Sequence, residues 1–174
     1  MDETFEPNKE SINLEKQDLK TFFIIHLDKV YTAKSHLIAM LPQIANHVHF
    51  TDLKVAIKET ITDVKKQITR MNMVYDLLGT SSKNGTHSGL TGLVDDSFKD
   101  IQLHSNHPEL RDLSILFYLQ NIESMEMASF QMLQISSVKL KDKKVQQLIK
   151  ENYDEAKGDR TLMLLIAAKY ITSI

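Results

Sequence analysis

Four long stretches of this chain repeat apolar residues at alternating three- and four-residue steps, the spacing that lines up one face of an α-helix. Only five glycines and three prolines occur among 174 residues, so long uninterrupted helices are possible. β-Branched residues do not alternate in strand-like runs. The sequence therefore predicts an all-α domain with four main helices. The predicted helices span residues 17–46, 51–78, 108–136 and 142–172.

The links between these helices predict how they connect. The first and last links are short, so each joins two antiparallel helices into a hairpin. The middle link holds a shorter amphipathic stretch, 90–101, and is long enough to run the length of the bundle. Two hairpins and one long crossover give a ferritin-like four-helix bundle. We expect residues 1–16 to form a flexible tail and 17–172 the bundle domain.

The predicted helix ends carry recognisable signals. Thr51 and Asp142 stand where N-cap residues are expected, because their side chains can accept hydrogen bonds from the first turn. Pro42 lies near the end of the first helix, which it should kink or loosen.

Each main helix carries charged or amide residues at mid-length, on the row expected to face the core. Since a helix rises 1.5 Å per residue, these groups should lie within about 6 Å of one level. Buried charges are costly unless they are paired or bind a metal. We therefore predict that they form one interior site. Its residues are Lys34, Asp63, Gln67, Glu123, Glu126, Glu155 and Asp159.

Two interpretations of this site stay open. In di-metal bundles, carboxylates from four helices hold two hard cations, and Glu-x-x-His pairs complete the ligand shell. The last three helices have no Glu-x-x-His, and Lys34 cannot ligate while protonated. The alternative is a metal-free network in which the Lys34 ammonium stabilises the carboxylates. The first interpretation makes Asp63, Gln67, Glu123, Glu126, Glu155 and Asp159 ligands of iron or manganese.

Short motifs around these residues resemble the YciE/YciF-like ferritin-like proteins of bacteria, a stress-associated family of unknown function. The resemblance covers about residues 18–170. Its motifs are Tyr31-Thr-Ala-Lys-Ser-His-Leu37 with Leu41-Pro42, Asp63-Val-Lys-Lys-Gln67, Tyr75-Asp-Leu-Leu-Gly79, Gly92-Leu-Val94, Glu123-Ser-Met-Glu126 and Asp154-Glu-Ala-Lys157. It implies a ferritin-like fold, a di-metal site, a role in stress and a homodimer. Lys34 departs from the family's glutamate, Asp63 is shorter than its glutamate, and Met125 replaces its tyrosine.

Composition argues against several other functions. The net charge of −2 gives no reason to expect a nucleic-acid partner. No apolar run approaches the roughly 18 residues of a membrane span. The acidic N-terminus lacks the apolar core of a signal peptide, so a cytoplasmic location is expected. The sequence also shows no phosphate-binding loop, nucleophile elbow or catalytic triad spacing.

These observations favour a ferritin-like, stress-associated bundle protein that is non-enzymatic, has no cofactor and forms a homodimer. Its vestigial di-metal site would be replaced by a Lys–carboxylate network. One alternative is a carboxylate-bridged di-iron or di-manganese protein acting on oxygen or peroxide. Another is a dimeric interaction module that uses the outer faces of the bundle.

Overall fold

The computed structural model describes residues 14–83 and 88–172, and these residues contain helices and connecting turns but no strand. The predicted all-α class is confirmed, and the helix ends lie close to those predicted. The helices are α1 (Lys16–Ala45), α2 (Thr51–Leu77), α3 (Ser88–Leu103), α4 (Pro108–Ser137) and α5 (Lys143–Thr172), with a 3-10 turn at Val138–Leu140. None of them combines the length and apolarity that crossing a membrane requires.

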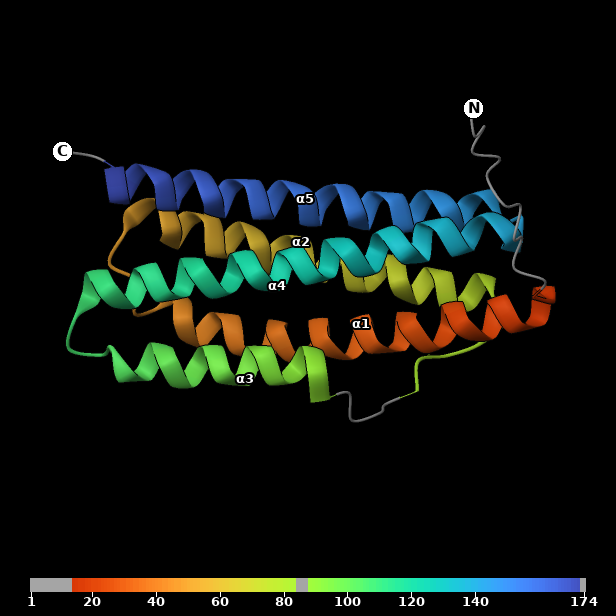
Figure 1. Ribbon diagram of the computed structural model, residues 1–174, viewed down its shortest axis with the longest axis horizontal. Helices are drawn as coiled ribbons and strands as arrows, with labels where there is room; N and C mark the ends of the chain where they lie inside the picture. Colours follow the sequence, from red (N-terminus) through yellow and green to blue (C-terminus); the bar gives the residue numbers. More distant parts are fainter. Residues whose placement is uncertain (1–13, 84–87, 173–174) are drawn as a thin grey trace, which may run out of the picture.

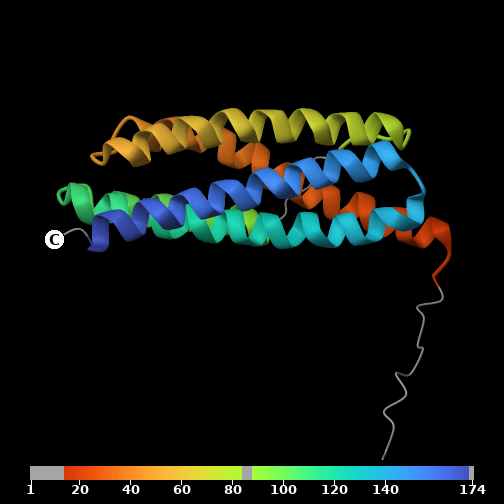
Figure 2. The ribbon, with the colours of Figure 1, turned by 90° about the horizontal axis from the view of Figure 1, so that it is seen from above.

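Four of these helices form an elongated bundle, with α3 on its outside (Figure 1). α1 packs against α2 and α4, and α5 packs against the same two helices, so α2 and α4 stand at opposite corners. α3 lies against α1 and α4 and runs along one half of α1 (Figure 1). Seen from above, it lies behind α4 and is largely hidden (Figure 2). The connectivity of two hairpins and one crossover holding a short helix is therefore as predicted.

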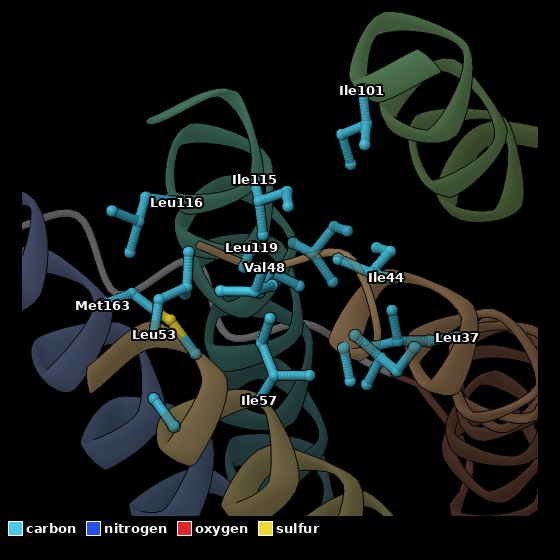
Figure 3. Packing of buried hydrophobic residues seen from close by; sticks show 14 of the residues in the cluster. Leu37, Ile44, Val48, Leu53, Ile57, Ile101, Ile115, Leu116, Leu119 and Met163 are labelled. Carbon is cyan, nitrogen blue, oxygen red and sulfur yellow. The ribbon is translucent and has the colours of Figure 1, made fainter. Parts of the chain in front are cut away.

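The apolar rows of the helices meet in two separate clusters along the bundle. One surrounds Leu37, Ile57, Ile115 and Met163, and includes residues from all five helices (Figure 3). The other lies toward the opposite end. It gathers Phe23, Leu27, Met71, Phe130, Leu133 and Leu148. The helical residues between these two clusters are the mid-length polar residues that the sequence singled out.

The two predicted N-caps have different outcomes. Asp142 is confirmed, because its Oδ1 accepts hydrogen bonds from the backbone N–H groups of Lys144 and Val145 at 2.9 and 3.0 Å. The prediction for Thr51 is wrong, because Thr51 is the first residue of α2 and the preceding Phe50 has no capping side chain. The turn before α2 is instead held by a carboxylate of α4, as described below. α1 continues through Pro42 to Ala45.

Candidate site at the middle of the bundle

Lys34 extends from α1 into the centre of the bundle, where it is fully buried. Its Nζ donates a hydrogen bond to Oε2 of Glu126 on α4, and the two groups form a buried ion pair. The same Nζ lies 5.7 Å from the centroid of the Phe130 ring, within the range of a cation–π contact. The ammonium is thus held by α4 on the far side of the α1–α4 interface.

Glu123 lies one turn before Glu126 and is also fully buried. Neither of its carboxyl oxygens has a hydrogen-bond partner among the described residues. Burial and the nearby charge of Glu126 raise the pKa of Glu123 well above its usual value, although Lys34 opposes this. The environment therefore favours the protonated, uncharged form of Glu123.

Asp159 brings a third carboxyl to this level from α5 and is almost completely buried. Burial, followed by the negative charge of Asp63, raises the pKa of Asp159 to about 7. Burial lowers the pKa of Lys34, but Glu126, Glu123 and Asp159 together raise it above the ordinary value. Lys34 therefore keeps its charge, while two of its acidic neighbours are biased toward the neutral form.

Gln67 contributes the amide of the site from α2. Its side chain is fully buried, and neither the nitrogen nor the oxygen of the amide has a partner among the described residues. Five of the seven predicted residues thus lie buried at one level of the bundle. They are Lys34, Gln67, Glu123, Glu126 and Asp159.

The other two predicted residues take partners at the edge of this level. Oδ1 of Asp63 accepts a hydrogen bond from Nζ of Lys66 at 2.7 Å. Both oxygens of Glu155 are held by the guanidinium of Arg70, with Nη1–Oε2 and Nη2–Oε1 distances of 2.7 Å each. This bidentate pair engages both carboxylate oxygens and balances the charge of Glu155, which disfavours metal coordination by this side chain.

The sequence interpretation missed Arg70 and Asn152. Nδ2 of Asn152 donates to the backbone carbonyl of Gln67, and its Oδ1 accepts a hydrogen bond from Arg70, both at 3.3 Å. Arg70 follows Gln67 by three residues, so it belongs to the same face of α2. The position of Arg70, one helical turn after Gln67, is the feature of the sequence that could have indicated a cationic partner for Glu155.

This donor set does not fit a carboxylate-bridged di-metal centre. Lys34 places an ammonium, which is a donor and not a ligand, against Glu126. Asp63 and Glu155 already bind cationic side chains. Within the described ranges, 14–83 and 88–172, no three His, Asp or Glu side chains come together in a way that could hold a metal ion. The arrangement can keep an ion pair and protonated carboxyl groups inside the bundle.

Residues 18–173 match the sequence family described as a domain of unknown function, DUF892. The chain belongs to this family. Two solved structures resemble this chain. "The crystal structure of the E.coli stress protein YciF" is 22% identical, with a TM-score of 0.83, and the match covers 90% of this chain and 98% of that chain. "YcfI, a putative structural protein from Rhodopseudomonas palustris" is 19% identical, with a TM-score of 0.80, and the match covers 88% of this chain and 98% of that chain.

These matches confirm the resemblance to YciF-like proteins that the sequence motifs indicated. At such identities the two structures establish the fold of this DUF892 member. No curated protein sequence matches the chain.

Proposed function

We propose that this protein is a non-enzymatic, stress-associated bundle protein whose vestigial di-metal site is replaced by a Lys–carboxylate network. The observation that carries the proposal is the buried ion pair between Lys34 and Glu126 at the centre of the bundle. One structural relative is named a stress protein and the other a structural protein, which supports a role of this kind. The proposal includes a cytoplasmic location and a homodimer.

Charge balance supports a centre that is stable without metal. Two divalent cations would neutralise four carboxylates, which is why a di-metal bundle can bury so many acids. Here one ammonium balances Glu126, while Glu123 and Asp159 have raised pKa values that favour bound protons. Arg70 balances Glu155, and Lys66 balances Asp63. Ammonium, guanidinium and protons together supply the positive charge that metal ions would otherwise bring.

Elemental analysis of protein purified without chelator tests the proposal directly. We expect less than about one iron or manganese per chain, because a complete di-metal bundle binds two. Two metals per chain, lost when Glu123→Gln and Glu126→Gln are combined, would overturn the proposal. That outcome would support the alternative of an iron or manganese protein that acts on oxygen or peroxide.

A substitution that introduces a carboxylate at position 34 provides the complementary test. Lys34→Glu adds another negative charge to a level that already holds Glu123, Glu126 and Asp159, so the metal-free variant should melt at a lower temperature than the parent. Added manganese should raise the melting temperature of this variant in proportion to its binding. The matched control is Lys58→Glu. Lys58 is an exposed lysine of α2, so this variant should show no rescue by metal. Rescue of the parent and the variant to the same extent would contradict the proposed role of Lys34.

A further inference from the structure

A cavity of about 300 Å³ opens at the end of the bundle that carries the turn between α1 and α2. It lies where α3 packs beside α1 and the beginning of α4, and all three helices contribute to its lining. Sites for small molecules have volumes of about 300–1,000 Å³, so this one is large enough for a small ligand. None of the seven residues of the interior polar level lines it, so the cavity is separate from the site around Lys34.

The inner wall of this cavity is apolar. It is formed by Ile44 of α1 and by Phe98 and Ile101 of α3, which are 5, 9 and 8% exposed. All three belong to the apolar cluster around Leu37, and Figure 3 shows Ile44 and Ile101 pointing toward that cluster. The cavity thus reaches from the surface to the edge of the core. An apolar group that entered it would leave water and contact these side chains, which is favourable.

The outer wall of the cavity is polar. Its exposed members are Gln43, His47, Gln102 and Ser105. Amide and hydroxyl groups of this kind can donate hydrogen bonds to a ligand. The ring of His47 is held in place, because its Nδ1 donates to the backbone carbonyl of Gln43 at 2.9 Å. No Asp or Glu of the described residues lines the cavity, so this wall suits a ligand group that accepts hydrogen bonds and carries negative charge.

Arg111 brings a permanent positive charge to the cavity, and its guanidinium has donors to spare. Nη2 donates to the backbone carbonyl of His47. Nε is buried without a hydrogen-bond partner among the described residues, because Oδ1 of Asp112 lies 3.6 Å away. Asp112 balances part of the charge but does not occupy these donors. Arg70 differs, since both oxygens of Glu155 accept hydrogen bonds from its guanidinium.

We propose that this cavity binds a small organic carboxylate with an apolar body. The apolar body lies against Phe98 and Ile101, and the carboxylate accepts hydrogen bonds from Arg111 and from the amide of Gln102. A planar guanidinium presents its N–H groups in the geometry that a carboxylate accepts. The two parts of the ligand thus match the two walls of the cavity. This inference goes beyond the proposed function and depends neither on the Lys34 network nor on the homodimer.

Nuclear magnetic resonance on the full chain, with 4-fluorobenzoate as the probe, tests the inference. This probe joins a carboxylate to an apolar ring. Backbone amide shifts should change at Ile101, Gln102, Ser105 and Arg111, with a dissociation constant of about 1 mM or lower. 4-Fluorobenzamide keeps the ring without the charge, and acetate keeps the charge without the ring. Each should bind at least about tenfold more weakly, because it matches only one wall.

Two substitutions test the residues assigned to the carboxylate. Arg111→Gln removes the guanidinium and should weaken binding of 4-fluorobenzoate at least about tenfold. Arg111 also holds the α1–α2 turn, so a second variant leaves it in place. Gln102→Glu puts a negative charge on the exposed wall and should weaken binding of 4-fluorobenzoate about fivefold, while binding of 4-fluorobenzamide stays the same.

The matched control is Gln131→Glu, which makes the same change of charge. Gln131 is exposed and lies about 30 Å further along α4 than Arg111, so this variant should bind the probe like the parent. Circular dichroism checks that all three variants remain helical.

Several outcomes would overturn the inference. Amide shifts that stay unchanged around the cavity at about 10 mM 4-fluorobenzoate would exclude the site. Equal binding of the probe by Gln102→Glu and the parent would place the probe elsewhere on the chain. Equal binding of 4-fluorobenzamide would show that the carboxylate is not recognised, and equal binding of acetate would show that the apolar wall takes no part.

Discussion

The ammonium of Lys34 lies where water does not reach it, so only protein groups stabilise its charge. Removing a cation or anion from water is costly, and an ion pair in the interior offsets that cost only when its geometry is good. Lys34 meets this condition through a direct hydrogen bond to Glu126 and through the ring of Phe130. Removing one partner of this ion pair should therefore lower the free energy of unfolding by more than removing one partner of a surface ion pair would.

Replacing Lys34 with methionine tests this expectation. Lys34→Met leaves Glu126 without its cation and should lower the free energy of unfolding by about 3 kcal/mol or more at pH 7. Lys34 opposes the burial that raises the pKa values of Glu123 and Asp159, so without the ammonium acid should favour folding and the loss should shrink at pH 5. Urea denaturation at both pH values measures the effect. The exposed Lys58→Met should cost little at either pH, and equal stability of Lys34→Met and the parent would refute the network.

Asp159 predicts a pH dependence of the opposite kind from that of a salt-bridged carboxylate. Its folded pKa of about 7 lies above the ordinary 3.8, so the folded protein holds the proton more tightly than the unfolded chain does. The resulting stabilisation is complete below about pH 4 and is lost as the pH rises through about 7. Asp159→Asn imitates the protonated form and should avoid this loss.

We therefore expect Asp159→Asn to unfold at higher urea concentration than the parent at pH 8. A gain of about 2 to 4 kcal/mol follows from a pKa shift of about three units. The difference should nearly vanish at pH 3. Asp154→Asn, on the exposed face of α5, is the control and should show no such trend. A variant less stable than the parent at pH 8 would show that the charged form of Asp159 is needed.

The sequence predicted which side chains lie in the interior of the bundle better than it predicted their hydrogen-bond and ion-pair partners. Lys34, Glu123 and Glu126 follow from helical spacing alone, because each lies on a row of apolar residues. The partner of Glu155 does not follow in this way. The helix rows place both Lys34 and Arg70 near the carboxylates, and only the packing of α2 against α5 decides that Arg70 reaches Glu155.

At the scale of the helices, one carboxylate of α4 fixes the start of α2. Oδ2 of Asp112 accepts hydrogen bonds from the backbone N–H groups of His49 and Phe50, at 2.7 and 2.6 Å. Beside it, Nη2 of Arg111 donates to the backbone carbonyl of His47. The beginning of α4 thereby holds the turn between α1 and α2, and it does so at the end of the bundle that α3 also covers.

Asp112→Ala should remove both hydrogen bonds to this turn. Buried N–H groups without a partner cost about 1–3 kcal/mol each, so we expect a loss of about 2 kcal/mol or more in the free energy of unfolding. Amide hydrogen exchange should accelerate at His49 and Phe50 before it does in α2. Asp52→Ala, in the first turn of the same helix and paired with Lys169 on the surface, should cost less than about 1 kcal/mol. Unchanged exchange at the two amides would contradict the role of Asp112 in holding this turn.

The helices themselves were predictable to within a few residues, because their rows of apolar side chains are long and regular. The contact that holds the turn before α2 was not, because Asp112 is 62 positions away from Phe50 along the chain. Local capping rules find a partner such as Asp142, which acts on its own helix. A contact supplied by another helix becomes visible only once the bundle is assembled.

For the whole molecule, the proposed homodimer has a thermodynamic consequence. A dimer that dissociates on unfolding is stabilised by mass action, so its melting temperature depends on protein concentration. We expect the melting temperature of the parent to rise measurably over a hundredfold increase in concentration. Concentration-independent melting of the parent would argue against a dimer.

The polar level between the two apolar clusters also bears on the axial register of the helices. Rows of leucine and isoleucine look much alike from one turn to the next, so a helix that slid by one turn of 5.4 Å would lose few favourable contacts. Lys34 does not permit such a slip, because it would leave Glu126 and enter an apolar cluster with its charge unpaired. Single buried polar residues set register in coiled coils in this way. The Lys34–Glu126 pair thus marks one alignment of α1 and α4 as correct and penalises the neighbouring ones.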